Sequence, residues 1–154
     1  MTITILTIGK SHDPALKAAI EDFSARLQRQ APLRWRFIPY SGLSDAAQAR
    51  KTESVALMAT IKPEDTVILL DERGQQWDSP TFARHIERWT VQTRGDIVFV
   101  IGGAYGVDQT VHQRALAVWS LSPLVFPHAI ARLIVVEQLY RAYTILNNMP
   151  YHHA

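Results

Sequence analysis

The chain alternates between short apolar runs and longer stretches whose apolar positions recur every three or four residues. The first run, TITILTIG at residues 2–9, alternates β-branched side chains and predicts a strand. The stretch after it predicts an amphipathic helix that Asp13 caps and Pro14 begins. The apolar positions of that helix are Leu16, Ile20, Phe23 and Leu27.

The same two patterns continue to residue 146. They first predict a half-exposed strand at 33–40 ended by Pro39, a helix at about 45–61 and a strand at 66–71. A helix at 79–89, which Ser79 caps and Pro80 begins, and a strand at 96–101 follow. The last predicted elements are a short helix from the cap Asp108 to Ala117, a strand at 118–122 and a helix at 128–146. The runs TVILLD and DIVFVI are apolar without alternation, as in parallel strands that are covered on both faces. We therefore expect an α/β fold: a single domain over 1–154 with a mostly parallel sheet flanked by helices.

The last predicted helix, at 128–146, is apolar nearly all round. Its polar exceptions are Arg132, Glu137, Gln138 and Arg141. A helix without a water-facing side must be buried, either within one subunit or between two. Because a chain of 154 residues cannot easily cover such a helix by itself, we expect a homodimer that uses it.

Composition narrows the possible chemistry. Apolar residues make up 47% and charged residues 19%, the balance of an ordinary globular domain. The chain has no cysteine, which excludes disulfides, thiolate zinc sites and cysteine nucleophiles. No signal pattern and no membrane-spanning apolar run is evident, so we expect a cytoplasmic protein without a membrane partner. The net charge of +2 permits a polyanionic partner, and the residues after 108 contain a single acid, Glu137.

Three strand ends carry candidate loops. They are LLDERG at 69–74, the glycine turn of FVIGGAYG at 99–106, and SLSPLVFPH at 120–128. Ligands of open parallel sheets bind outside the carboxyl ends of the strands. The loops are glycine-permissive and apolar, which suits a flat heterocycle such as that of S-adenosylmethionine. The glycines are equally consistent with a tight turn and no ligand.

Two common phosphate-binding motifs do not fit the chain. The dinucleotide fingerprint GxGxxG fails because Ala104 and Val107 stand where it needs glycines. GKS at 9–11 mimics the end of a phosphate loop, but the first glycine of that motif would fall at Thr4, within a strand. No loop offers a lysine or arginine cluster for a di- or triphosphate.

LLDERG, FVIGGAYG and SLSPLVFPHAIARLIVVEQLYRAYTILNNMPYHH resemble the bacterial ribosomal large-subunit pseudouridine methyltransferase family of the SPOUT superfamily. The likeness covers the whole chain and is most specific in FPHxxARxxxxEQxYRAxxI and PYH. It implies methyl transfer from S-adenosylmethionine to N3 of a pseudouridine in 23S rRNA, and a homodimer. It also implies a deep trefoil knot with the cofactor site at about 66–146, and a substrate tail at 147–154.

The resemblance assigns cofactor contacts to the three loops. They fall on Leu70, on Gly103 with its neighbours Gly102 and Gly106, and on Leu121, Ser122, Pro123, Leu124, Val125 and Phe126. We expect the glycines to let the cofactor lie against the backbone, where a side chain would collide with it.

The N3 imide of pseudouridine is nucleophilic mainly as its anion, so the site needs a general base or cations. His128, directly after the third loop, is the expected base. We expect Arg132 and Arg141 to bind phosphate or to favour the ionised base, and Tyr151 and His152 to shape the nucleobase pocket.

Other polar groups have simpler explanations. Glu137 and Arg141 are four residues apart and are expected to form a structural pair. The acids at 71–72 are adjacent on a strand and should point in opposite directions, which does not suit a paired-carboxylate hydrolase. His152–His153 lacks an evident third ligand, so no metal is expected.

The sequence does not decide whether two basic regions contact RNA. One contains Arg34, Arg36, Arg50 and Lys51, and is either a solvated face or part of an RNA track. In the other, after the PYH motif, His153 and Ala154 stand where relatives more often carry a basic residue. Histidine is mostly uncharged near neutral pH, which weakens a phosphate contact there.

Two rival functions remain at the level of sequence. One is a ribosome-binding module with a vestigial cofactor pocket, and the other is a nucleotide-dependent oxidoreductase. An S-adenosylmethionine-analogue resin should retain the methyltransferase, a dinucleotide resin should retain the oxidoreductase, and neither should retain the binding module.

Overall fold

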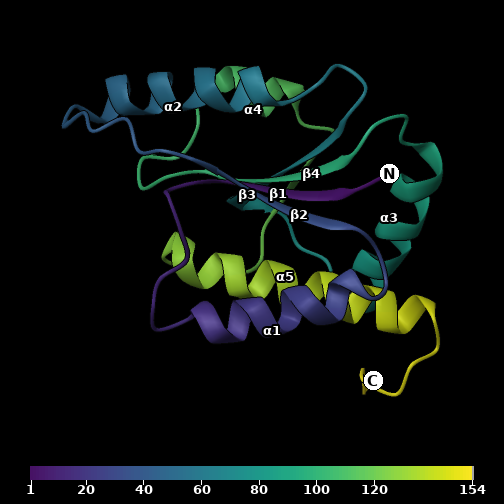
Figure 1. The fold of residues 1–154 in the computed structure, drawn as a ribbon. Coiled ribbons are helices and arrows are strands. Elements are labelled where there is room, and N and C mark those ends of the chain that lie inside the picture. Colours follow the sequence, from purple (N-terminus) through teal and green to yellow (C-terminus); the bar gives the residue numbers. More distant parts are fainter. Residues whose placement is uncertain (154) are drawn as a thin grey trace.

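The computed structural model describes residues 1–153, so Ala154, the last residue of the predicted tail, lies outside the described residues. A five-stranded sheet lies between two helical layers, with α2 and α4 on one face and α1 and α5 on the other (Figure 1). The elements are β1 (Ile3–Ile8), α1 (Lys17–Gln28), β2 (Leu33–Ile38), α2 (Ala46–Thr60), β3 (Thr66–Gln75), α3 (Ser79–Gln92), β4 (Ile97–Ile101), α4 (Gln109–Arg114), β5 (Ala117–Trp119) and α5 (His128–Leu146).

The sheet has the strand order β2-β1-β4-β3-β5, and all of its strand pairs are parallel. The strands β1 and β4 are buried throughout, because both have neighbours on each side and helices on each face. The predicted α/β fold with a parallel sheet flanked by helices is thus confirmed. All strands end at one edge, which is where loop chemistry gathers in such sheets.

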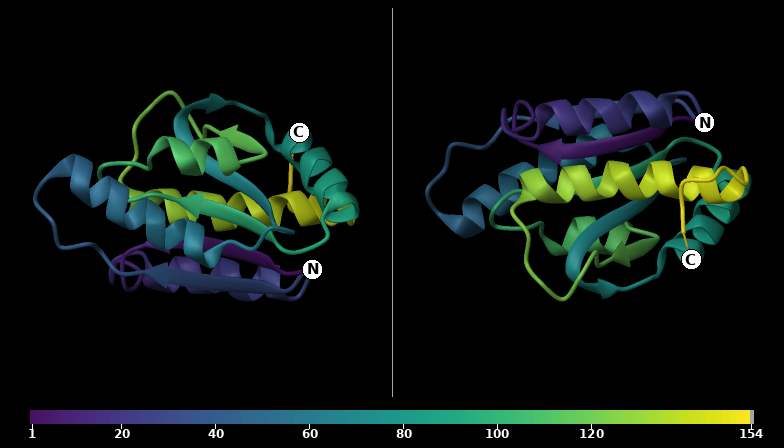
Figure 2. Two further views of the ribbon diagram at one scale, coloured as in Figure 1. Left: turned by 90° about the horizontal axis from the view of Figure 1, so that it is seen from above. Right: turned by 90° about the horizontal axis from the view of Figure 1, so that it is seen from below.

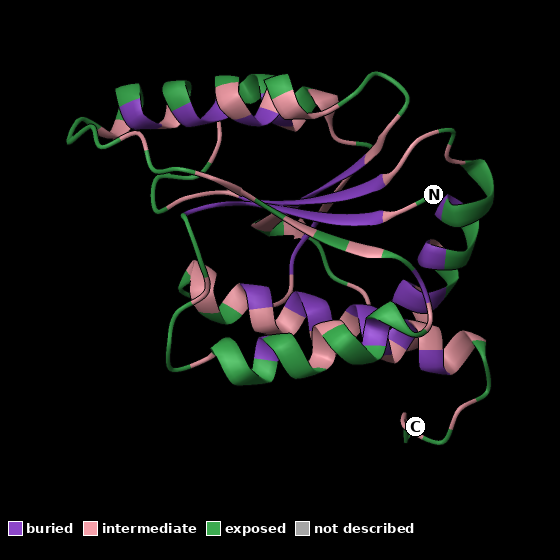
Figure 3. Ribbon diagram, in the orientation of Figure 1, coloured by how far each residue is buried: buried purple, intermediate pink, exposed green. Residues whose placement is uncertain are grey.

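Two apolar cores hold the layers together. The larger fills the space between the sheet and the helices α1, α3 and α5, and the smaller lies between the sheet and α2 with α4. Figure 3 shows this arrangement, with buried residues along the strands and on the inner faces of the helices. Within residues 1–153, no helix is long and apolar enough to cross a membrane.

The predicted start of α1 was three residues early. Asp13 caps a turn instead: its Oδ1 accepts from the Ala15 amide at 2.8 Å, and its carbonyl accepts from the Leu16 amide at 2.9 Å. The helix itself begins at Lys17. An Asp-Pro start favours this tight turn as well as a helix, and the sequence does not distinguish the two.

The cap of α3 was also misassigned. Asp78, not Ser79, is the N-cap, and its side chain accepts from the Thr81 amide at 2.8 Å. The hydroxyl of Ser79 donates instead to Gln138 of α5 at 2.7 Å. Aspartate and serine are both good caps, so the geometry of the chain before Pro80 decided between them.

The strand β3 is longer than predicted and continues through the expected turn at 69–74. A bulge between Leu70 and Gln75 allows Trp119 of β5 to pair with both. Gly74 is required by this crossing, because a Cβ there would lie 2.5 Å from the Val118 carbonyl oxygen. The first candidate loop is therefore an extended strand end.

Helix α5 lies beside α1 and α3 and under the sheet (Figure 2). Of its residues only Ile130 is exposed, and Arg132, Val136 and Thr144 are among those fully buried. Helices α1 and α3 pack against α5, but Leu133, Ile134 and Ile145 are only partly buried, so the chain covers its last helix in part. The homodimer remains a prediction.

Candidate active site

The three predicted loops meet in one cavity of about 790 Å³ at the carboxyl edge of β3, β4 and β5. Its wall combines residues 70–73 of β3, residues 101–107 after β4, and most of the segment from Trp119 to Ala131. Every residue expected to contact a cofactor lines this cavity except Pro123. The structure thus brings together residues that lie up to about 60 positions apart in the sequence.

The cavity wall is mainly apolar. Leu70, Ile101 and Trp119 come from the strand ends. At the rim, Leu124 and Val125 are 68% and 77% exposed. A ligand in the cavity would cover this surface.

The glycine turn closes on itself. The Gly106 amide donates to the Gly103 carbonyl at 3.0 Å, and the two residues form an isolated bridge. Gly106 has φ +72°, a left-handed conformation that disfavours a side chain, and a Cβ there would meet nothing within 4 Å. The turn therefore needs glycine at 106 for backbone conformation.

Gly103 packs closely on the protein beneath the turn. A Cβ at this position would lie 2.8 Å from Glu53 Oε1 and 3.3 Å from Ile8 Cγ2. These groups belong to the protein beneath the turn, so the packing of the turn on α2 and β1 leaves little room for a side chain at 103. The expectation that the cofactor also lies against this backbone stays a prediction.

Glu53 lies beneath the glycine turn, and sequence reasoning missed it. It is 5% exposed, and its Oε2 accepts from the Ser41 amide at 3.2 Å. Its Oε1 has no hydrogen-bond partner within residues 1–153. Ala49, Glu53 and Leu57 are buried at four-residue spacing on α2, so an acid within a buried stripe was the available signal.

His128 begins α5 and lines the cavity. One ring nitrogen, Nε2, lies 2.7 Å from the hydroxyl of Tyr40, a residue of the β2–α2 connection that sequence reasoning also missed. Burial, and secondarily the positive charge of Arg132, lower the pKa of His128 below its usual value. The imidazole is therefore neutral near pH 7 and is able to accept a proton.

Arg132 does not have the role expected of it. Its side chain is 2% exposed, and its guanidinium donates to Thr7 Oγ1 at 3.1 Å, to the Ser11 carbonyl at 2.7 Å and to the Ile8 carbonyl at 2.8 Å. It also lies 5.5 Å from the centre of the Phe37 ring. Because all three nitrogens bind the end of β1 and the loop after it, the group cannot reach a phosphate or an ionised base.

Arg141, Tyr151 and His152 form a second cluster around Glu137. The Arg141 guanidinium donates to Glu137 Oε1 at 2.7 and 3.1 Å, and the Tyr151 hydroxyl donates to the same oxygen at 2.9 Å. A third Arg141 nitrogen lies 3.1 Å from His152 Nδ1. Burial, together with the hydrogen bond to Glu137, raises the pKa of Tyr151.

The predicted catalytic residues are therefore divided between two places in one chain. His128 and Arg141 lie on the same helix, roughly 20 Å apart at about 1.5 Å per residue. Only His128 lines the cavity.

The acids at 71–72 are separated, as expected. Asp71 binds Arg73 at 2.8 and 3.1 Å and lies 3.6 Å from His112, while Glu72 is exposed. The hydrogen bonds with Arg73 lower the pKa of Asp71. Within residues 1–153, no group of three or more histidine or acidic side chains is arranged to hold a metal ion.

Comparisons with known proteins agree with this geometry. A family model described as "Predicted SPOUT methyltransferase" matches residues 1–152. The "Ribosomal RNA large subunit methyltransferase H" of Pelobacter propionicus is 41% identical over 153 residues, covering 99% of this chain and 100% of that protein. The protein of the same name from Gloeobacter violaceus is 39% identical, and the match covers 99% of both chains.

Two solved structures share the fold at 14% sequence identity. A probable methylase family protein from Haemophilus influenzae has a TM-score of 0.55 over 99% of this chain and 70% of its own. A probable methyltransferase from Bordetella pertussis has a TM-score of 0.56 over 92% of this chain and 95% of its own. Together with the full-length match to the family model, these likenesses confirm the resemblance in the loop motifs: the chain belongs to the SPOUT methyltransferase family.

Proposed function

We propose that the protein transfers a methyl group from S-adenosylmethionine to N3 of a pseudouridine in 23S rRNA of the large ribosomal subunit. One observation carries the proposal. In a chain about 40% identical over its whole length to proteins named ribosomal RNA large subunit methyltransferase H, the three loops that resemble the family's cofactor loops line a single cavity. The cytoplasm, where ribosomes lie, is the proposed location.

The cavity fits S-adenosylmethionine. Its volume of about 790 Å³ lies within the range of about 300–1,000 Å³ that is usual for small-molecule sites. We propose that Leu70, the turn at 102–106 and the loop at 121–126 hold the cofactor, with apolar side chains against its heterocycle and backbone groups at its polar edges. The cofactor supplies a methyl group on a positively charged sulfonium, which makes that methyl group electrophilic.

The residues around His128 prepare the acceptor. We propose that His128 takes the N3 proton, leaving the electron pair on nitrogen for the methyl group. In the tautomer whose Nε2–H donates to the Tyr40 oxygen, Nδ1 is free to accept that proton. Tyr40 is then a positioning residue, and Tyr40→Phe should lower kcat and shift the pH profile with little change in KM.

The second cluster is proposed to act on the partner's cavity. Arg141, which contacts His152, lies roughly 20 Å along α5 from His128 in one chain, too far to meet one nucleobase with it. A homodimer that crosses at α5 would bring one subunit's tail, residues 147–154, to the other subunit's cavity. The exposed Arg34, Arg36 and Lys51 would then extend the phosphate-binding surface.

The trefoil knot implied by the resemblance is also proposed, over about residues 66–146. Contacts around the end of β3 are consistent with it. The Gln75 carbonyl, at the end of β3, accepts from the Ser120 amide at 2.8 Å, and Ser79 at the start of α3 binds Gln138 of α5 at 2.7 Å. The chain between β3 and α3 thus contacts both the end of β5 and α5, the two parts that the proposed knot would bring together.

Subunit exchange tests the composite site. His128→Ala removes the proposed base, and Arg141→Ala removes the proposed tail contact, so each homodimer should lose methyl transfer to rRNA. In mixed dimers, one site of the two would combine an intact cavity with an intact tail, and roughly a quarter of wild-type activity should return after random exchange. Absence of rescue, with exchange verified by mass, would refute the composite site.

Cofactor identity has a simpler test. Isothermal titration should show binding of S-adenosylmethionine and none of a nicotinamide dinucleotide. Binding of the dinucleotide alone would favour an oxidoreductase, and binding of neither would favour an RNA-binding module.

A further inference from the structure

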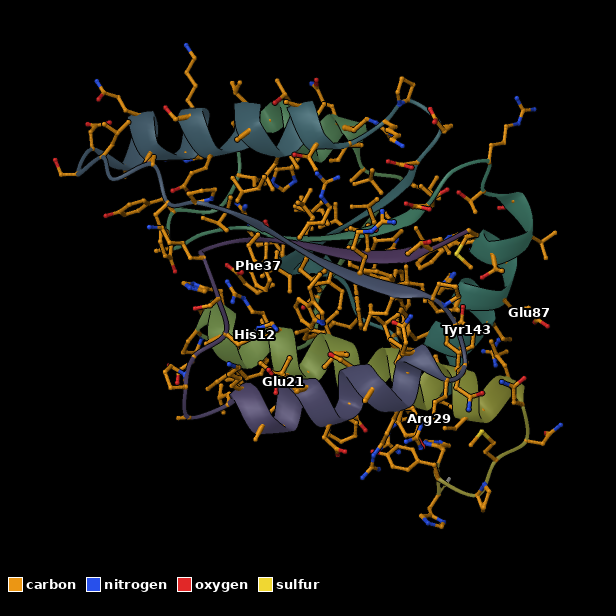
Figure 4. All side chains as sticks on the ribbon, in the orientation of Figure 1. His12, Glu21, Arg29, Phe37, Glu87 and Tyr143 are labelled. Carbon is orange, nitrogen blue, oxygen red and sulfur yellow. The ribbon has the colours of Figure 1, made fainter. Side chains whose placement is uncertain are left out.

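A second cavity, of about 380 Å³, lies at the same carboxyl edge of the sheet, beside β2. Its residues come from the β1–α1 loop, from one face of α1 and from one face of β2, namely Lys10, Ser11, His12, Lys17, Glu21, Ser24, Trp35 and Phe37. In Figure 4, His12 and Phe37 lie between the sheet and α1 at the end where α1 begins, and Glu21 lies on the helix beside them. The cavity is separate from the site described above.

The amphipathic pattern of α1 explains why this space is open. The helix buries Ile20 and Leu27 against the core, and it lies along α5. Its polar residues Lys17, Glu21 and Ser24, which recur on another face, are the ones that line the cavity. Two large aromatic rings on the edge strand β2 are therefore left only partly covered.

The aromatic wall is ordered. Trp35 Nε1 donates to Ser24 Oγ at 2.9 Å, and the Trp35 ring is nearly parallel to that of Phe37, with 10° between planes. The His12 ring stands edge-on to both, with centroids 4.5 and 5.2 Å away. His12 Nδ1 makes no hydrogen bond within the described part of the chain, so these ring contacts hold the side chain in place. A planar ring entering the cavity meets a preformed stacking surface.

The charge at the mouth of this cavity is positive. Lys10 is exposed and forms no ion pair within residues 1–153. Lys17 has only a loose pair with Glu21, at 3.8 Å with both side chains about 60% exposed, which neutralises it weakly. Burial, and then the charge of Arg132, lower the pKa of His12.

Arg132 links the two cavities. It binds the Ser11 carbonyl in the wall of the second cavity, and it lies one helical turn after His128, which lines the first. Two to three strand spacings of about 4.8 Å separate β2 from β4 and β3, so the cavities are roughly 10–15 Å apart. Neighbouring nucleotides of one RNA strand bridge such a distance.

We propose that the second cavity binds an unpaired nucleobase of the RNA substrate, near the methylated nucleotide, stacked on Trp35 with its phosphate at Lys10. Stacking on aromatic rings beside basic groups is the general mode by which proteins hold single strands. The proposal rests on the proposed function for the identity of the RNA. It adds a binding site that would keep the substrate strand open beside the methyl-transfer site.

The direct test is the indole Nε1–H spectrum of the full chain, which has four tryptophans. A uridine heptanucleotide should shift the Trp35 signal, assigned from Trp35→Phe, and leave those of Trp77 and Trp89 in place. Lys10→Glu should raise the Kd of this RNA about tenfold and reduce its salt dependence. The matched control is Lys62→Glu, an exposed lysine at the opposite edge of the sheet, which should leave the Kd unchanged.

Catalysis provides a second readout. With the ribosomal substrate, Trp35→Leu should raise KM about five- to hundredfold, the loss expected for one stacked base, at unchanged kcat. Because Trp35→Leu also alters a partly buried ring, its unfolding midpoint must be measured, and Lys10→Glu keeps the test valid if that variant is unstable. A Trp35 signal that ignores RNA, or an equal Kd for Lys10→Glu and wild type, would overturn the proposal.

The outcomes separate this proposal from the proposed function. Methyl transfer to rRNA that neither substitution affects would leave the enzyme in place and refute the second site. A Trp35 shift with RNA in a protein that methylates no rRNA would support the second site and refute the function. A Trp35 signal that changes on dilution and ignores RNA would assign the cavity to a contact between two copies of the chain, against the proposal.

Discussion

Replacing Arg132 by methionine tests whether this arginine supports the fold or contacts RNA. Methionine keeps an apolar stem of similar length and removes every donor. The change leaves the carbonyls of Ile8 and Ser11 and the hydroxyl of Thr7 without the partners that now lie 2.7–3.1 Å away. It also removes the charge that helps to lower the pKa values of His12 and His128.

The expected cost follows from these contacts. Each buried polar group left unpaired costs about 1–3 kcal/mol. The variant no longer buries a charged guanidinium, and the desolvation free energy that this saves offsets part of the total cost. We expect Arg132→Met to lower the free energy of unfolding by about 3 kcal/mol. For a chain of this size that corresponds to a fall in Tm of about 6–12 °C.

Urea unfolding followed by far-ultraviolet circular dichroism measures the effect at one fixed protein concentration, because a dimer would make stability concentration-dependent. Arg29→Met makes the same chemical change at an exposed position and should alter stability by less than about 0.5 kcal/mol. The imidazole signals of His12 and His128 should titrate at higher pH in Arg132→Met. If Arg132→Met has wild-type stability but binds RNA more weakly, the structural role is refuted and the predicted contact of Arg132 with phosphate is supported.

Three further predictions concern packing and pH. Gly103→Ala should destabilise the fold by about 1–3 kcal/mol through its collision with Glu53. Adding Glu53→Ala should recover more than about 0.5 kcal/mol in a double-mutant cycle. If the stability changes of the two single variants simply add in the double variant, the contact is contradicted. Gly74→Ala should cost about 1–3 kcal/mol or more in urea unfolding, because its Cβ would meet the Val118 carbonyl, and a neutral effect would contradict the close crossing of β3 and β5. Burial is the main cause of a lowered pKa in three histidines, His12, His85 and His128. The folded state therefore resists their protonation, so stability should be complete above about pH 6.5 and fall as the pH drops through the lowered values; unfolding curves between about pH 8 and 5 that do not change would contradict this.

The elements that the sequence predicted well are those whose signals are local. The apolar runs of β1 and β4, the approximate extent of α2 and the start of α5 after Pro127 each depend on residues within one turn or strand. The gathering of the three loops at one edge also followed, because parallel strands end on the same side of a sheet.

What the sequence could not predict depends on contacts between distant segments. Tyr40 and His128 are 88 positions apart, and no pattern connects them. Arg132 looked available because an arginine on an apolar helix is normally turned towards a ligand or solvent. Its partners are backbone carbonyls more than 120 positions earlier, and backbone acceptors leave no trace in side-chain chemistry.

The covering of α5 shows the same limit. Its all-round apolar character predicted burial correctly, but not the partner, because α1 and α3 present their own apolar residues to it from both sides. Glu53 is a further case. Its place in a buried stripe was visible, whereas its position under Gly103 required the β4 turn to be placed against α2.

Methyl transfer to ribosomal RNA is the measurement that tests the central proposal most directly. Labelled S-adenosylmethionine would be supplied with naked 23S rRNA, isolated large subunits or assembled ribosomes, each prepared from cells that lack the methyl group. We predict label on at least one of these substrates, located by mass spectrometry at N3 of a single pseudouridine and lost with His128→Ala. Absence of label on all three, in a protein that binds S-adenosylmethionine, would contradict the proposed function.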